Sequence, residues 1–200
     1  FRNGESGLHV LHVNTITKRL LEQLVRVTDE YSLSPVDISL ISTASALHDI
    51  GKISISDSIL NKPGRLTEEE FEEIKTHTVI GANMLSDLPI EQQEAPLVKV
   101  ASEICRWHHE RYDGKGYPDG LKGEEIPIAA QVVSLADVYD ALISERCYKK
   151  AYSHGEALKM ILEGQCGAFN PSLLLCLQEI ADILESELKN VSPEQETKNM

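Results

Sequence analysis

The stretch ALHDIGKI, residues 46–53, places His48 directly before Asp49 and follows them with Gly51 and Lys52. On an α-helix, neighbouring side chains point about 100° apart, so two adjacent side chains face one target only near a helix end. Gly51 predicts such an end, because glycine readily adopts the left-handed conformation that closes a helix. We therefore expect an imidazole, a carboxylate and an ammonium group to gather around one target at the end of a helix.

On both sides of this stretch, apolar residues recur with helical periodicity. Thr67 and Glu70 have the spacing of a capping box, and Pro171 is a favourable residue for the start of a last helix. Glycines and prolines interrupt the periodicity near 111–127, which predicts one ordered loop. The sequence predicts an all-α bundle of about seven helices, over residues 8–30, 35–49, 67–76 (continuing, with or without a brief break, into 77–88), 91–110, 128–144, 153–165 and 171–187.

The length of the chain predicts one domain with a short tail. A chain of 200 residues with 42% hydrophobic content can form one packed core. We expect this domain to span residues 1–187, and the polar residues 188–200 to form a frayed tail. Because the first residue is Phe1 rather than methionine, we also expect the chain to be a piece of a longer protein, with an upstream domain.

The composition restricts the class of partner and the compartment. The formal net charge of −13 argues against a protein that binds nucleic-acid polymers, because such proteins meet phosphates with basic residues. No apolar run approaches the roughly 18 residues that a membrane span requires. Four cysteines without a CxxC pair fit a reducing, cytoplasmic location. An anionic substrate must therefore be bound by local cations, either side chains or metal ions.

Eight histidine and carboxylate side chains are candidates for one metal centre, although each has an ordinary alternative. A lone histidine such as His77 is usually a partly buried residue with one hydrogen bond, and adjacent histidines can cap a helix C-terminus. A glutamate four residues before a histidine can form a surface pair, and Asp137 can cap a helix or pair with Arg146. The candidates are Glu5, His9, His48, Asp49, His77, His108, His109 and Asp137.

Taken together, these residues favour metal-dependent chemistry over eight separate ordinary roles. Nitrogen and oxygen ligands without a thiolate suit hard or borderline divalent cations rather than a structural zinc site. Eight ligands imply at least two cations, and two cations a few ångströms apart can clamp the attacking and leaving oxygens of a phosphoryl displacement. Lys52 follows Asp49 by one helical turn, where it can neutralise charge on the attacked phosphate.

The order of these residues along the chain resembles the HD superfamily of metal-dependent phosphohydrolases. The segment HHERYDGKGYP, residues 108–118, narrows the resemblance to the HD-GYP family, helical phosphodiesterases of bacterial signalling that open cyclic di-GMP. The HD dipeptide alone is a weak signal, whereas this loop motif with its collinear partners is a strong one. The similarity extends over nearly the whole chain, from ESGLH at 5–9 to FNPSLL at 169–174.

The resemblance implies two or three divalent cations, iron or manganese, held by the candidate ligands. Asp49 is expected to bridge two of the cations. In some family members, the residues that match Glu5 and His9 contribute to a third cation. The implied ligands of the first two cations are His48, Asp49, His77, His108, His109 and Asp137.

The resemblance also implies the residues that bind substrate. Lys52 matches a lysine that contacts the scissile phosphate, Arg146 and Lys149 match basic residues that hold substrate phosphate, and the loop with Tyr117 borders the site. We expect cyclic di-GMP to be hydrolysed to linear pGpG, and the sequence leaves open whether a second cut gives GMP. The expected partners are an upstream sensor or receiver domain, diguanylate cyclase-type proteins and a second copy in a homodimer.

Three positions depart from the family pattern, and two other functions stay open. Arginine is usual where His12 stands, proline where Cys147 stands, and threonine is commoner than Ser6. His12 follows His9 by three residues and so lies next to the region of the third cation. The first alternative function is hydrolysis of another cyclic dinucleotide or of a nucleotide monophosphate. The second is a low-activity cyclic di-GMP receptor or a module that binds partner proteins.

Overall fold

The computed structural model describes residues 7–145 and 151–190, and within these ranges the chain is helical, with no strand. Seven of its α-helices have at least nine residues, which confirms the all-α bundle of about seven helices. None of the helices in these ranges is long and apolar enough to cross a membrane. The long helices are α1 (Gly7–Val27), α2 (Pro35–Ala44), α4 (Glu68–Ser86), α6 (Pro96–Trp107), α7 (Ile128–Ile143), α8 (His154–Leu162) and α9 (Pro171–Asn190), and the short ones are α3 (Asp57–Leu60), α5 (Ile90–Gln93) and the 3₁₀ helices η1 (Ser45–Leu47), η2 (Ile50–Ser54) and η3 (Gly123–Glu125).

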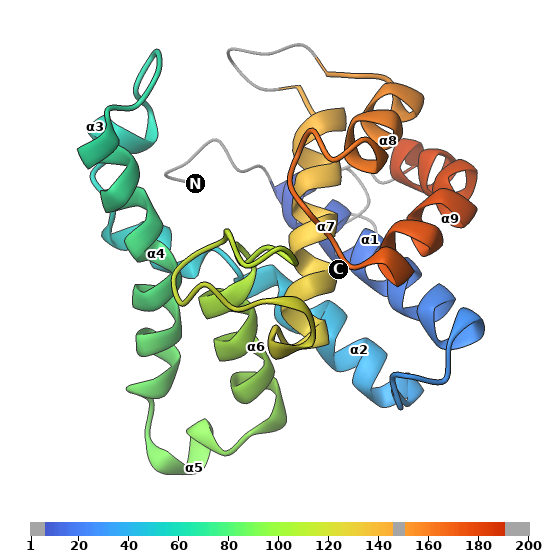
Figure 1. The fold of residues 1–200 in the computed structure, drawn as a ribbon. Helices are drawn as coiled ribbons and strands as arrows, with labels where there is room; N and C mark the ends of the chain where they lie inside the picture. The colour runs from blue at the N-terminus through green and yellow to red at the C-terminus, as the bar shows by residue number, and fades with distance from the viewer. Residues whose placement is uncertain (1–6, 146–150, 191–200) are drawn as a thin grey trace.

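Helix α7 lies at the centre of the bundle (Figure 1). It contacts α1, α6 and α8. Its sequence is apolar on almost every side, and Val132, Val133, Leu135 and Ala136 are fully buried. On one side of α7 the helix α1 packs with α2 and α9, and on the other side α6 packs with α4. A carboxylate on this helix therefore sits inside the protein, where it needs a cation or hydrogen bonds.

Helix α1 packs against α7 and carries two of the buried histidines. Ile16, Leu20 and Leu24 recur every four residues and are fully buried, so one stripe of the helix faces the core. The N-terminal part of the same helix carries His9 and His12, which are also buried. Helix α1 contacts α2, α7 and α9, and this packing positions the two histidines against α7.

Helix α4 runs from the predicted segment 67–76 into the predicted segment 77–88 without a break. The predicted capping box forms, because the Thr67 hydroxyl accepts the N–H of Glu70 at 3.2 Å and the Glu70 carboxylate accepts the N–H of Thr67 at 2.7 Å. The helix then runs to Ser86 and packs against α6 and η2. His77 is thus held in the middle of a regular helix, fully buried.

The end of α2 differs from the prediction. The helix expected to reach residue 49 stops at Ala44 and continues as η1, and Gly51 lies inside η2 without a left-handed conformation. Glycine is needed here because the backbones touch: a Cβ on Gly51 would lie 2.0 Å from the carbonyl oxygen of His77 and 2.6 Å from the nitrogen of Gly81. This contact brings the turn that carries the histidine–aspartate pair up to α4.

The helix predicted at 91–110 is divided in the structure into α5 (Ile90–Gln93) and α6 (Pro96–Trp107), because Pro96 has no N–H group and starts a new helix. The other predicted boundaries agree with the structure to within a few residues. Helix α1 ends at Val27 rather than at residue 30. Helix α9 continues to Asn190, past the expected end at 187, and the rest of the tail lies outside the described residues. The segment 111–127 is irregular apart from η3, as expected for a loop.

Replacing Gly51 with alanine is expected to lower the free energy of unfolding by about 1–3 kcal/mol, because a methyl group has no room between η2 and α4. Urea unfolding followed by circular dichroism measures the change. The matched control is Gly155→Ala in α8, where nothing lies within 4 Å of the added Cβ. Equal losses of stability in the two variants would contradict the close contact of η2 with α4.

Candidate metal centre

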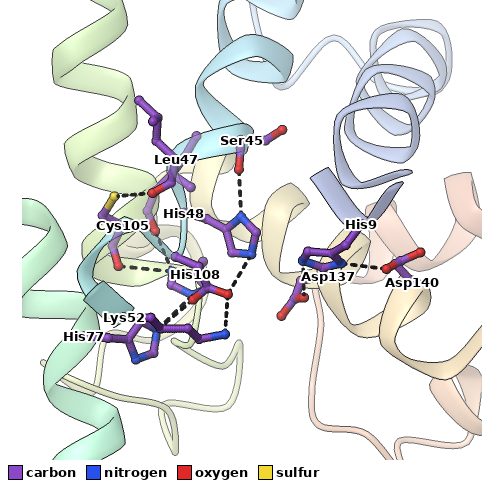
Figure 2. Close-up of polar contacts among 12 residues, drawn as sticks. His9, Ser45, Leu47, His48, Lys52, His77, Cys105, His108, Asp137 and Asp140 are labelled. Carbon is purple, nitrogen blue, oxygen red and sulfur yellow. Dashed lines mark hydrogen bonds and ion pairs between the residues drawn. The ribbon is translucent and has the colours of Figure 1, made fainter. Parts of the chain in front are cut away.

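The turn between η1 and η2 carries His48 and Asp49 and places them inside the protein. Figure 2 shows His48 together with His9, His77 and His108. His48 is 1% exposed, and its Nε2 lies 3.2 Å from Oδ2 of Asp49. The ammonium group of Lys52 donates to the same oxygen at 2.5 Å. The three groups therefore do gather around one point, although a turn between two 3₁₀ helices brings them there rather than a glycine-capped helix end.

Each of three histidines of the centre makes the same kind of hydrogen bond, and this bond decides which ring nitrogen faces the site. In each of them Nδ1 donates to a backbone carbonyl oxygen three or four residues earlier. Because a carbonyl only accepts, Nδ1 carries the hydrogen and Nε2 of the neutral ring keeps its lone pair, which is the atom that binds a metal. The pairs are His48 with Ser45 (2.8 Å), His77 with Ile74 (2.6 Å) and His108 with Ile104 (2.9 Å).

One set of candidate ligands gathers between α4, α6 and the turn after η1. We call it the first ligand group, and its ligand-type atoms all lie within 4.8 Å of one another. Oδ1 of Asp49 lies 3.2 Å from Nε2 of His77 and 3.7 Å from Nε2 of His108. The first ligand group consists of Asp49, His77, His108 and His109.

A second ligand group draws on three other segments. Its members are His9 from α1, His48 from the turn and Asp137 from α7, and their ligand-type atoms also lie within 4.8 Å of one another. Nε2 of His9 lies 3.6 Å from Oδ1 of Asp137. The two groups adjoin at the contact of His48 with Asp49. Ligands that are far apart in the sequence thus form one continuous cluster.

Burial and charge set the protonation of the centre. Burial lowers the pKa of His108, and burial with the neighbouring histidines holds the pKa of His109 well below its ordinary value. Burial alone would raise the pKa of Asp49, but the histidine rings hold it well below the usual range. Burial also opposes a charge on His48, yet the Asp49 carboxylate outweighs it and raises the pKa of His48 to about 9. A metal cation would take the place of that His48 proton.

The residues of the two groups fit divalent cations. Nε2 of His48 and Oδ1 of Asp49 are buried and make no hydrogen bond within the described part of the chain, which is costly unless a cation meets them. The nearby Cys105 is not a competing ligand. Its Sγ donates to the carbonyl oxygen of Leu47 at 3.1 Å, and burial raises the pKa of its thiol to about 12. The donors are thus nitrogen and oxygen, which suit hard or borderline metals.

A cavity of about 450 Å³ borders the first ligand group. His77, His109 and Asp137 line it from the metal-binding side, and Lys52 and Tyr117 line it as well. A substrate in this cavity would therefore touch the candidate ligands and the lysine at the same time. This is the arrangement expected for a site that binds an anionic ester.

The loop at 111–127 is held against the centre by specific contacts. The Tyr117 ring stacks on the His109 ring, with ring centroids 4.9 Å apart. The backbone N–H of Tyr117 donates to the backbone carbonyl oxygen of His109. Oε1 of the buried Glu110 accepts the N–H groups of Asp119 and Gly120 at 2.7 and 3.0 Å. Tyr117 therefore lies beside the first ligand group, and its role in binding substrate stays a prediction.

Sequence reasoning missed Asp140, which lies one turn after Asp137 on α7. Asp140 is 1% exposed and accepts hydrogen bonds from Nδ1 of both His9 and His12, each at 2.6 Å. Burial would raise the pKa of Asp140, but the hydrogen bonds from the two histidines lower it to about 2. The available signal was the spacing, because two carboxylates three residues apart in an apolar helix face the same side.

Three residues that the resemblance assigned to the site lie outside the described residues. They are the third-cation ligand Glu5 and the phosphate-binding residues Arg146 and Lys149. The alternative pairing of Asp137 with Arg146 therefore stays a prediction. The ordinary alternative for His77 was a partly buried histidine with one hydrogen bond; His77 is fully buried instead, it does bond to the carbonyl oxygen of Ile74, and its role as a metal ligand stays a prediction.

Comparison with known proteins places this geometry in a family context. Residues 8–173 match the profile of the HD domain family. A cyclic di-GMP phosphodiesterase of Vibrio cholerae is 43% identical over 175 residues, which are 86% of this chain and 35% of the relative. A 3'3'-cGAMP-specific phosphodiesterase 2 of the same organism is 35% identical and is matched over 89% of this chain and 32% of its own length. The chain thus spans about a third of these relatives.

A solved structure shares the fold. Bd1817, an HDGYP protein from Bdellovibrio bacteriovorus, superimposes with a TM-score of 0.63 and 23% sequence identity, over 88% of this chain and 51% of that protein. At this level of identity the similarity concerns the fold, and it agrees with the helical bundle described above.

Removal of divalent metals is expected to lower the unfolding temperature, because cations bind only the folded protein, in which the ligands of separate segments meet. At a cation concentration 100-fold above the Kd, bound metal adds about 2.7 kcal/mol. Calorimetry with a chelator and then with added Mn²⁺ measures the shift. The His77→Ala variant should show a smaller shift in unfolding temperature on metal addition. The control variant Glu72→Gln, at an exposed position of the same helix, should show the full shift. An unfolding temperature that is the same with chelator and with added Mn²⁺ would contradict the proposed metal centre.

Proposed function

This chain belongs to the HD domain family, and from that premise we propose that it is a metal-dependent phosphodiesterase that hydrolyses cyclic di-GMP to pGpG and on to GMP. The observation that carries the proposal is the contact of two buried ligand groups with each other, beside a cavity lined by Lys52 and Tyr117. A phosphodiester needs cationic groups on both of its reacting oxygens, and adjoining cation sites can supply them.

The proposed cofactors are two divalent cations, iron or manganese, with a third where Glu5 contributes. The first ligand group would hold one cation and the second ligand group another, with Asp49 of the first group in contact with His48 of the second. When bound, such cations lower the pKa of a water molecule and neutralise phosphate charge. The nitrogen and oxygen donors support either metal, since imidazole and carboxylate ligands accept both.

The side chains around the cavity have distinct proposed tasks. Lys52, anchored by Asp49, binds the oxygen of the phosphate under attack and stabilises its growing negative charge. Tyr117, fixed on the ring of His109, closes one side of the cavity. Arg146 and Lys149 follow α7 in the sequence, and we assign to them the second phosphate of the cyclic dinucleotide. These local cations offset the net charge of −13.

The reaction adds one water across one P–O bond. The water oxygen bonds to phosphorus in line with the bond that breaks, the 3′ oxygen of the ribose leaves and takes up a proton, and a 5′-phosphate remains. One such step opens the ring of cyclic di-GMP to linear pGpG, and a second step on pGpG gives two GMP. His9 and the other imidazoles of the two ligand groups would hold the cations.

A second candidate is hydrolysis of another cyclic dinucleotide, 3'3'-cGAMP. The observation in its favour is the relative of that specificity, which matches this chain at 35% identity. The higher identity, 43%, to a relative named for cyclic di-GMP supports the first candidate. A low-activity receptor is the third candidate, and the presence in the two ligand groups of all the ligands implied for the first two cations weighs against it.

The proposed setting is cytoplasmic. We propose that the domain of residues 1–187 is the effector part of a longer bacterial signalling protein with an upstream sensor or receiver domain. The relatives, of which this chain spans about a third, support a longer protein. A homodimer and diguanylate cyclase-type partners complete this proposal.

Replacing Lys52 with alanine is expected to lower kcat for cyclic di-GMP by roughly 100- to 1000-fold, because the developing charge on the phosphate loses a fixed cation. Metal content should not change, and elemental analysis of the same samples checks this. The matched control is Lys99→Ala, an exposed lysine of α6 paired with Glu94. Chromatography of the products also compares the rates on cyclic di-GMP and 3'3'-cGAMP.

Three outcomes of that assay would contradict the proposal. Faster turnover of 3'3'-cGAMP than of cyclic di-GMP would favour the second candidate. Tight binding of cyclic di-GMP without hydrolysis by metal-loaded protein would favour the receptor. Full activity of Asp49→Ala in a metal-replete assay would show that the two ligand groups are not the reacting centre.

A further inference from the structure

Two pairs of residues with the same spacing face each other across the contact of α1 with α7. His9 and His12 are three residues apart on α1, and Asp137 and Asp140 are three residues apart on α7. His9 lies between the two carboxylates, with Nε2 3.6 Å from Oδ1 of Asp137 and Nδ1 2.6 Å from Oδ2 of Asp140. Nδ1 of His12 then meets the other oxygen of Asp140, also at 2.6 Å.

We infer that Asp140 and His12 are positioning residues for the second ligand group. Asp140 accepts the Nδ1 hydrogen of His9 and so directs Nε2 of that ring toward Asp137 and His48, while His12 holds Asp140 in the orientation that this requires. The inference rests on the metal centre of the proposed function. It concerns how tightly the second ligand group binds its cation.

The hydrogen bond on Nδ1 decides what His9 can offer to a metal. His9 has a carboxylate on Nδ1, where His48, His77 and His108 have backbone carbonyls. A carboxylate acceptor fixes the hydrogen on Nδ1, leaves the lone pair on Nε2 and makes the ring a stronger donor to a cation. A side-chain acceptor can rotate, however, whereas a carbonyl within a helix cannot.

Asp140 therefore needs contacts of its own. Oδ2 meets His9, and Oδ1 meets both His12 and the hydroxyl of Ser144, which donates at 2.9 Å. With both oxygens occupied, the plane of the carboxylate is fixed. The donors on Oδ1 are His12 of α1 and Ser144, which directly follows α7, so the contact of His12 with Asp140 also ties α1 to α7 at the level of the site.

An arginine at position 12 could do the same work on Asp140 as His12, because both side chains donate hydrogen bonds to a carboxylate. A competing role exists, because Nε2 of His12 is buried and has no hydrogen-bond partner in the described part of the chain. If that nitrogen itself bound a cation, arginine could not replace it.

The test compares metal binding by His12→Arg, His12→Ala and Asp140→Asn with the wild type. Glu22→Gln, on the same helix and paired with Arg19, is the matched control. Competition with a metal-binding dye measures the affinity for each Mn²⁺ equivalent, and circular dichroism confirms the fold of each variant. We expect His12→Ala and Asp140→Asn to weaken one equivalent by roughly 10- to 100-fold, with His12→Arg close to the wild type.

Three results would overturn the inference. Wild-type affinity in both His12→Ala and Asp140→Asn would show that neither residue supports a ligand. Loss of an equivalent in folded His12→Arg, equal to that in His12→Ala, would show that His12 is itself a ligand. Weakening of every equivalent alike in Asp140→Asn would point to general damage rather than to the second ligand group. If wild-type protein binds two equivalents but does not hydrolyse cyclic di-GMP, the proposed function fails and this inference does not.

Discussion

The site depends on the Nδ1 hydrogen bonds of four imidazoles, those of His9, His48, His77 and His108. Three of the acceptors are backbone carbonyl oxygens about one helical turn earlier in the chain, and the fourth is the carboxylate of Asp140. Because each acceptor fixes a hydrogen on Nδ1, Nε2 is the ring atom left to bind a cation. The metal-binding character of the centre therefore comes from backbone geometry as much as from the ligand residues themselves.

The packing of the bundle explains how carboxylates are placed in the interior at the metal centre. Helix α7 is apolar on almost every side, so Asp137 and Asp140 are carried into the core by the burial of their neighbours. Ionised carboxylates are stable at such depth only when cations or donors surround them. Asp140 has its donors within the protein. Asp137, which faces the cavity and His9, is the one that a metal ion would complement.

Much of this arrangement could be predicted from the sequence, because helical periodicity and the family resemblance both depend on local patterns. The two ligand groups bring together seven of the predicted ligands, which are His9, His48, Asp49, His77, His108, His109 and Asp137. The role of Gly51 could not be predicted, since its contact with the backbone of α4 depends on tertiary packing. Asp140 was missed for a similar reason: only the packing of α1 on α7 reveals its two histidine partners.

Anomalous X-ray diffraction from crystals of metal-loaded protein tests the central claim most directly. The account predicts one anomalous peak within the first ligand group and another within the second, with His48, His77 and His108 bound through Nε2 and their Nδ1 hydrogen bonds intact. A metal bound through Nδ1 of these rings, or protein that takes up less than one equivalent of metal at saturation, would contradict it.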